Sequence, residues 1–224
     1  MPPKIGPMRG APCTAPAAMK SVVAAEVAAL GAWRTLHAGD RVGGIVFDDD
    51  GQVEYRPKRS RRAVHRLLET VAARNSALTA EREVERQPGA LNAVLQSVSR
   101  IAHHDHLVFI FSDFDGIDDD THRHLKSIAL HNDLILVLVH DPLAIQLRDR
   151  GRAIVGDHAL QAELELGSSS TRSALEAYSN ARLARIHDWQ AEITLSVLPL
   201  SAGLETLPQV RELLGRYGGA RRPR

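Results

Sequence analysis

LVFIFSDFDG, residues 107–116, carries the strongest fold signal in this chain. Its first five residues, Leu107–Phe111, are uninterrupted apolar residues, and a polar turn follows them. Such a run predicts a strand that is buried on both faces, as strands of parallel sheets are. Ligands of open parallel sheets bind beyond the carboxyl ends of the strands. Ser112, Asp113 and Asp115 therefore mark the edge at which we expect contacts.

Apolar strand patterns alternate with helical patterns on both sides of this stretch. A second apolar strand is predicted at 134–139, with a helix at 118–130 between the two strands. The other predicted helices are 18–37, 61–73, 89–101, 170–190 and 204–217, and the other predicted strands are 42–47, 52–55, 152–155, 162–166 and 192–197. Apolar strands that alternate with amphipathic helices predict a three-layer α/β fold with a mostly parallel, doubly wound sheet.

The composition divides the chain into four parts. Residues 1–17 contain five prolines and predict an irregular arm. Residues 18–141 form the expected α/β core, and residues 142–217 complete it with a hairpin, a long helix and a final strand and helix. Residues 218–224 form a basic tail.

Composition also limits the class of protein. The chain has 224 residues, a net charge of +1 and a single cysteine, Cys13. This excludes an internal disulfide framework and gives no overall attraction to nucleic acid. No apolar run approaches the roughly 20 residues of a membrane-spanning helix, and the N-terminus does not resemble a signal peptide. We expect a cytoplasmic protein that binds no specific nucleic acid.

Several segments, in order along the chain, resemble one known family. They are Lys20–Val22, Ala24–Glu26, Ala28–Ala29, Ala32–Trp33, Gly39–Gly44, Phe47, Ser112–Phe114, Asp133, His140–Pro142, Arg172 and Tyr178. The chain is identified by them as a member of the bacterial domain-of-unknown-function family number fifty-eight. That family resembles a von Willebrand factor A domain, with a metal-dependent adhesion site at the carboxyl ends of the strands. Its genes commonly lie beside MoxR-type AAA+ ATPases, so the resemblance implies a non-enzymatic adaptor that works with such an ATPase in protein assembly or remodelling.

The metal site that the resemblance implies is incomplete in this sequence. The family's first strand ends in Asp-x-Ser-x-Ser, and no such motif precedes Lys20. Gln87–Ala90 stands where a threonine loop belongs, so Asp113 alone matches a ligand position. Mg²⁺ needs about six oxygen ligands. We therefore expect a defective or absent metal site, with Mg²⁺ bound only if a longer product keeps the site intact. We also expect an N-terminal truncation that removes the first central strand.

An alternative is a haloacid dehalogenase-type phosphohydrolase, metal-dependent, with Asp113 as nucleophile and Asp115 as acid/base. An aspartate that follows an apolar strand suits this chemistry. The motif normally opens its domain, however, whereas more than a hundred residues precede it here. The simplest interpretation is that both aspartates shape a turn.

Two further groups of residues carry charge or metal-binding chemistry. His103, His104 and His106 precede the strand that Asp113 follows, so about 16 Å separates them from it and joint zinc binding is not expected. Arg56–Arg62 is the densest basic segment, and either a solvated helix start or a contact with phosphate or an acidic partner accounts for it.

Overall fold

A computed structural model describes residues 19–78, 89–141, 152–157, 160–165 and 169–217 of the chain. The predicted arm (1–17) and basic tail (218–224) lie outside these ranges, and so does Cys13.

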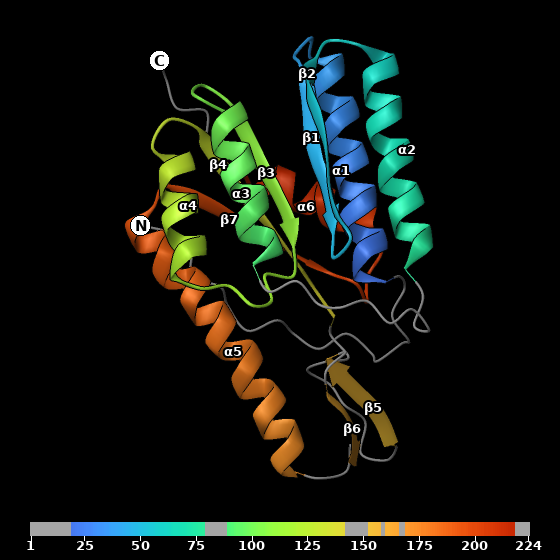
Figure 1. The fold of residues 1–224 in the computed structure, drawn as a ribbon, viewed down its shortest axis with the longest axis vertical. Coiled ribbons are helices and arrows are strands. Elements are labelled where there is room, and N and C mark those ends of the chain that lie inside the picture. The colour runs from blue at the N-terminus through green and yellow to red at the C-terminus, as the bar shows by residue number, and fades with distance from the viewer. Residues whose placement is uncertain (1–18, 79–88, 142–151, 158–159, 166–168, 218–224) are drawn as a thin grey trace.

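The centre of the fold is a parallel sheet of three strands (Figure 1). Its order is β3 (Leu107–Ser112), β4 (Asp133–His140) and β7 (Leu195–Ser201). β4 is the middle strand, and four of its residues in a row, from Leu136 to Val139, are buried. The apolar run is continuous because both faces of the strand are covered.

Helices cover the two faces of this sheet. On one face lie α1 (Lys20–His37) and α6 (Thr206–Tyr217), where a core cluster joins Val23 to Val137 and Leu200. On the other face lie α3 (Ala90–Ile101), α4 (Asp119–Ala129) and α5 (Ser169–Glu192). Their core cluster joins Leu95, Leu125 and Trp189 to the opposite side chains of β3 and β4. The predicted three-layer α/β fold with a parallel sheet is confirmed.

A separate antiparallel pair, β1 (Val42–Asp48) and β2 (Gly51–Lys58), lies beside this sheet and packs against α2 (Arg61–Ala77). The hairpin turns at Gly51, whose φ of 128° suits glycine. Arg74 of α2 reaches back to the turn, where it pairs with Asp48 and donates to the carbonyl of Gly51 at 3.2 Å.

β1 and β3 are edge strands, each hydrogen-bonded to another described strand on one side only. Among the described strands, β1 pairs with β2 alone and β3 pairs with β4 alone. α1 contacts both β1 and β3, and α3 contacts β1 and β2. Leu107 and Phe109 of β3 are 56% and 38% exposed, which is unusual for large apolar residues of a parallel sheet. A further central strand at this edge stays a prediction.

The chain between β4 and β7 contains the second hairpin, β5 (Arg152–Asp157) and β6 (Leu160–Glu165). Figure 1 shows this hairpin standing apart from the three-stranded sheet. None of the described helices is long and apolar enough to cross a membrane.

Several predicted boundaries are wrong by three or four residues; β2, for example, extends to Lys58 rather than ending at residue 55. The last strand was expected at 192–197, but α5 continues to Glu192 and β7 begins at Leu195. The amide of Ile193 still donates to the carbonyl of Trp189, so the helical bonding pattern extends past the predicted end. The helix predicted at 61–73 continues to Ala77, because Arg74 is anchored on the hairpin turn.

Candidate functional site at the carboxyl edge of the sheet

The turn that follows β3 is shaped by the predicted site residues themselves. The hydroxyl of Ser112 accepts a hydrogen bond from the Phe114 amide at 3.0 Å, and the Asp113 carboxylate accepts one from the Asp115 amide at 3.3 Å. Phe114 has a φ of 53°, a left-handed conformation that is strained for an aromatic residue. The side chains of Ser112 and Asp113 therefore shape the turn, as the sequence suggested for Asp113, whereas Asp115 contributes its backbone amide.

Phe114 explains how the turn is held in place. Its side chain is fully buried in the core cluster below α3, α4 and α5. With Phe114 pointing inward, the flanking Asp113 and Asp115 remain at the edge, where their side chains are 33% and 28% exposed. The burial of one aromatic ring compensates for the backbone strain and presents two carboxylates.

Each of the two carboxylates meets a cation from a different helix. Lys20 Nζ, at the start of α1, lies 2.5 Å from Asp113 Oδ2. Arg182 Nη1, on α5, lies 3.8 Å from Asp115 Oδ1. The edge thus joins β3 to helices on opposite faces of the sheet.

Neither Lys20 nor Arg182 is predicted as a site residue from the sequence. A signal existed for Lys20, since a lysine at the first position of a helix opposes the helix dipole and α1 has no acidic residue in its first turn. Such a lysine favours a carboxylate nearby. Arg182 carried no comparable signal, because its proximity to Asp115 depends on how α5 crosses the sheet.

His140 ends β4 at the same edge, next to Asp141. Burial lowers the pKa of His140 below its ordinary value, because the imidazolium loses hydration. Asp141 raises this pKa and the nearby Arg182 lowers it. The imidazole of His140 is therefore neutral at neutral pH.

A second polar group extends this edge onto α4. Asp118 caps α4 by accepting from the Thr121 amide at 2.8 Å, and the side-chain amide of Asn92 donates to both of its oxygens. The Thr121 amide is the main reason that the pKa of Asp118 is lowered. Arg185 of α5 pairs with Asp119. Most of the acidic side chains around the turn are thus engaged by donors.

The donor set at this edge does not fit a magnesium ion. Asp113 offers one carboxylate, which an ammonium group already contacts. Among the described residues, no group of three or more His, Cys, Asp or Glu side chains is placed to hold a metal. Mg²⁺ prefers a near-octahedral set of about six oxygen ligands. A single carboxylate that already contacts an ammonium group does not supply such a set.

The loop of His103, His104 and His106 lies at the amino end of β3, as predicted. His106 directly precedes β3, and its amide donates to Asn132 Oδ1, which precedes β4. His104 pairs with Asp105 at 2.8 Å. The strand β3 separates this loop from Asp113, so the two groups do not form one site.

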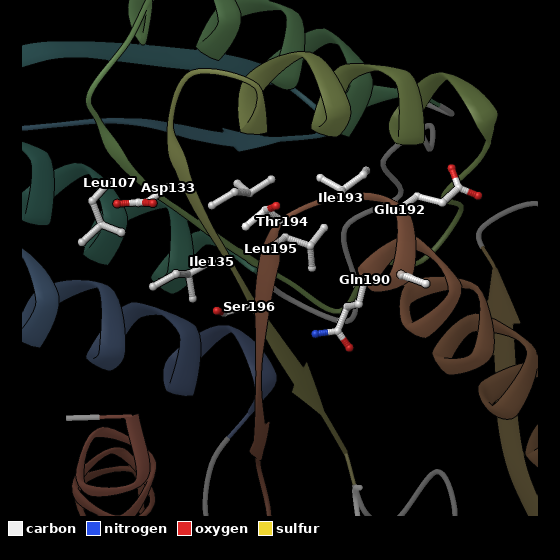
Figure 2. Close-up of a pocket in the computed structure, with 11 residues that line it drawn as sticks. Leu107, Asp133, Ile135, Gln190, Glu192, Ile193, Thr194, Leu195 and Ser196 are labelled. Carbon is white, nitrogen blue, oxygen red and sulfur yellow. The ribbon is translucent and has the colours of Figure 1, made fainter. Parts of the chain in front are cut away.

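A hollow of about 550 Å³ also lies at the amino ends of the strands. Figure 2 shows it between Leu107 and Asp133, where β3 and β4 begin, and Gln190 and Glu192, where α5 ends. It does not coincide with the carboxyl edge that the sequence predicted as the contact region. The carboxyl edge is therefore a surface of paired charges rather than a part of this hollow.

Comparison with known families identifies the same family that the sequence resembles. No curated protein and no solved structure matches the chain. The family model described as DUF58, protein of unknown function, matches residues 13–185. The chain therefore belongs to the DUF58 family.

Proposed function

We propose that this protein is a non-enzymatic adaptor that binds a partner protein through the carboxyl edge of its sheet, at Ser112, Asp113 and Asp115. The domain is proposed to be a von Willebrand factor A-like core, 18–141, completed by 142–217. The partner class that the family resemblance implies is a MoxR-type AAA+ ATPase, acting in protein assembly or remodelling.

The observation that carries this proposal is the arrangement of charge around Asp113. The carboxylates of Asp113 and Asp115 face cations that come from α1 and α5, on opposite faces of the sheet. A partly exposed ion pair such as Lys20–Asp113 contributes little to folding, about 0–1 kcal/mol, and can exchange for a pair across an interface. A mixed-charge edge with two orientable carboxylates suits the recognition of a protein surface.

The experiment is a binding measurement with the purified MoxR-type ATPase of the same organism. Asp113→Asn/Asp115→Asn removes both charges while keeping the size of the side chains and the turn. We expect this variant to bind at least tenfold more weakly, in line with the loss of paired charges at an interface. The control is Asp133→Asn, which removes an exposed carboxylate at the opposite end of β4 and leaves binding unchanged.

Equal binding by both variants, or no binding by the unaltered protein, contradicts the proposal. The phosphohydrolase alternative has its own test, which is hydrolysis of a generic phosphomonoester with Mg²⁺. Turnover that disappears in Asp113→Asn overturns the adaptor proposal in favour of an enzyme.

A further inference from the structure

A second charged surface lies at the end of the molecule opposite Asp113. α1 ends, β1 begins, β2 ends and α2 begins at the same end, as Figure 1 shows. We call this surface the basic corner and define it by six exposed cations: Arg41, Lys58, Arg59, Arg61, Arg62 and Arg66.

The strand register brings these residues together from separate segments. Val42 pairs with Lys58, so Arg41 and Arg59 flank a pair of opposed residues. The guanidinium of Arg59 lies against Gly39, where an added Cβ would be 2.6 Å from Nη2. Arg61 and Arg62 follow one residue later and open α2.

Negative charge is scarce around these cations. Asp40 is the sole acidic residue within 38–41 and 58–66. Across the part of the chain that the structure describes, none of the six cations forms an ion pair. A chain with a net charge of +1 thus concentrates unneutralised positive charge at one end.

The start of α2 makes this concentration costly for the isolated chain. Its first turn contains Arg61 and Arg62 and no acidic residue, although the positive end of a helix dipole favours acidic residues. Ser60 provides the cap by accepting from the Ala63 amide. Anionic groups bound beside this helix start would interact favourably with the dipole and with both guanidinium groups.

We propose that the basic corner docks an acidic polypeptide segment, rich in Asp and Glu, of a partner protein. Five of the six cations are arginines. The planar guanidinium group of arginine can bind a carboxylate with two parallel hydrogen bonds. The cations cluster where four elements meet, rather than along a groove that follows a nucleic acid strand.

Aromatic side chains also argue for a protein ligand rather than a single-stranded nucleic acid. Binding of unpaired bases normally uses exposed rings as stacking platforms. Trp33 is the aromatic residue that the structure places beside the start of α2, and it is half-buried. Its ring meets the His65 ring edge to face, with 5.2 Å between the two ring centroids. No tryptophan, tyrosine or phenylalanine occurs within 38–41 or 58–66.

Fluorescence anisotropy of a labelled oligoglutamate peptide tests this proposal. The variant is Arg41→Gln/Arg61→Gln/Arg62→Gln, and the matched control, Arg123→Gln/Lys126→Gln/Arg211→Gln, removes three exposed cations from α4 and α6. We expect the corner variant to bind at least tenfold more weakly and the control to bind within twofold of the unaltered protein. Arg61→Lys/Arg62→Lys should bind with intermediate affinity, because the charge remains and the fork is lost.

Two outcomes overturn the proposal. One is equal weakening by the corner variant and the control, which means that only net charge matters. The other is an oligonucleotide of equal charge that binds the unaltered protein as tightly as the peptide and loses affinity in the corner variant, which assigns the surface to nucleic acid. Thermal unfolding of each variant verifies that the chain is folded.

Discussion

Lys20 Nζ lies 2.5 Å from Asp113 Oδ2, so the first residue of α1 is ion-paired to the carboxylate that follows β3. This pair connects the start of the first described helix to the turn that the sequence singled out. It also places an ammonium group at the one position where the family resemblance implied a metal ligand.

The first prediction concerns this pair and metal binding. Because Asp113 is contacted by Lys20, and the described residues include no group of three or more His, Cys, Asp or Glu side chains placed to hold a metal, millimolar Mg²⁺ should not raise the melting temperature above that in NaCl of equal ionic strength. A ligand at about 100 times its Kd would add about 2.7 kcal/mol, which differential scanning calorimetry detects easily. A rise specific to Mg²⁺ that is lost in Asp113→Asn contradicts this expectation.

The second prediction concerns the anchor of the turn. Phe114 is fully buried, so Phe114→Ala should lower the free energy of unfolding by about 3–5 kcal/mol, measured by urea titration. Leu130→Ala truncates a residue that is 73% exposed and should cost no more than about 0.5 kcal/mol. A small effect at Phe114 means that the ring does not hold the turn.

The third prediction concerns pH. Burial lowers the pKa of His140 in the folded chain below 6.5, so the unfolded chain takes up the proton more readily. Stability is therefore lost as the pH falls from about 6.5 through the folded pKa. His140→Gln removes this dependence, and its free energy of unfolding relative to the unaltered protein should rise as the pH is lowered across that range. His187→Gln, at an exposed position of α5, is the matched control because it makes the same substitution away from the carboxyl edge.

The fourth prediction concerns the outer edge of β3. Among the described strands nothing pairs with this edge, and Phe109 stacks on Phe111 while remaining 38% exposed. Exposed apolar strand edges promote association between chains. Phe109→Lys should reduce concentration-dependent self-association in static light scattering, because a lysine blocks edge pairing.

Leu130→Lys is the matched control for that experiment, since it replaces an apolar residue that is more exposed but ends a helix. Equal reduction by both variants would attribute the association to general hydrophobicity rather than to the strand edge.

The local sequence was sufficient to predict the element types and the fold class. The apolar runs of β3 and β4 identify strands covered on both faces, and the order of helices and strands limits the sheet to a parallel one. The separation of His103, His104 and His106 from Asp113 was also predictable, because the apolar strand that became β3 lies between them. These conclusions depend on periodicity and chain distance alone.

Only the tertiary structure showed which charges meet. Lys20 and Asp113 are 93 positions apart, and Arg182 comes to Asp115 from a helix on the opposite face of the sheet from α1. Likewise, Arg41 joins Lys58 and Arg59 only because β1 pairs with β2 in one register. Ion pairs and charged surfaces depend on how helices cross the sheet and how strands align, and those relationships arise from packing across the whole core rather than from any local pattern of residues.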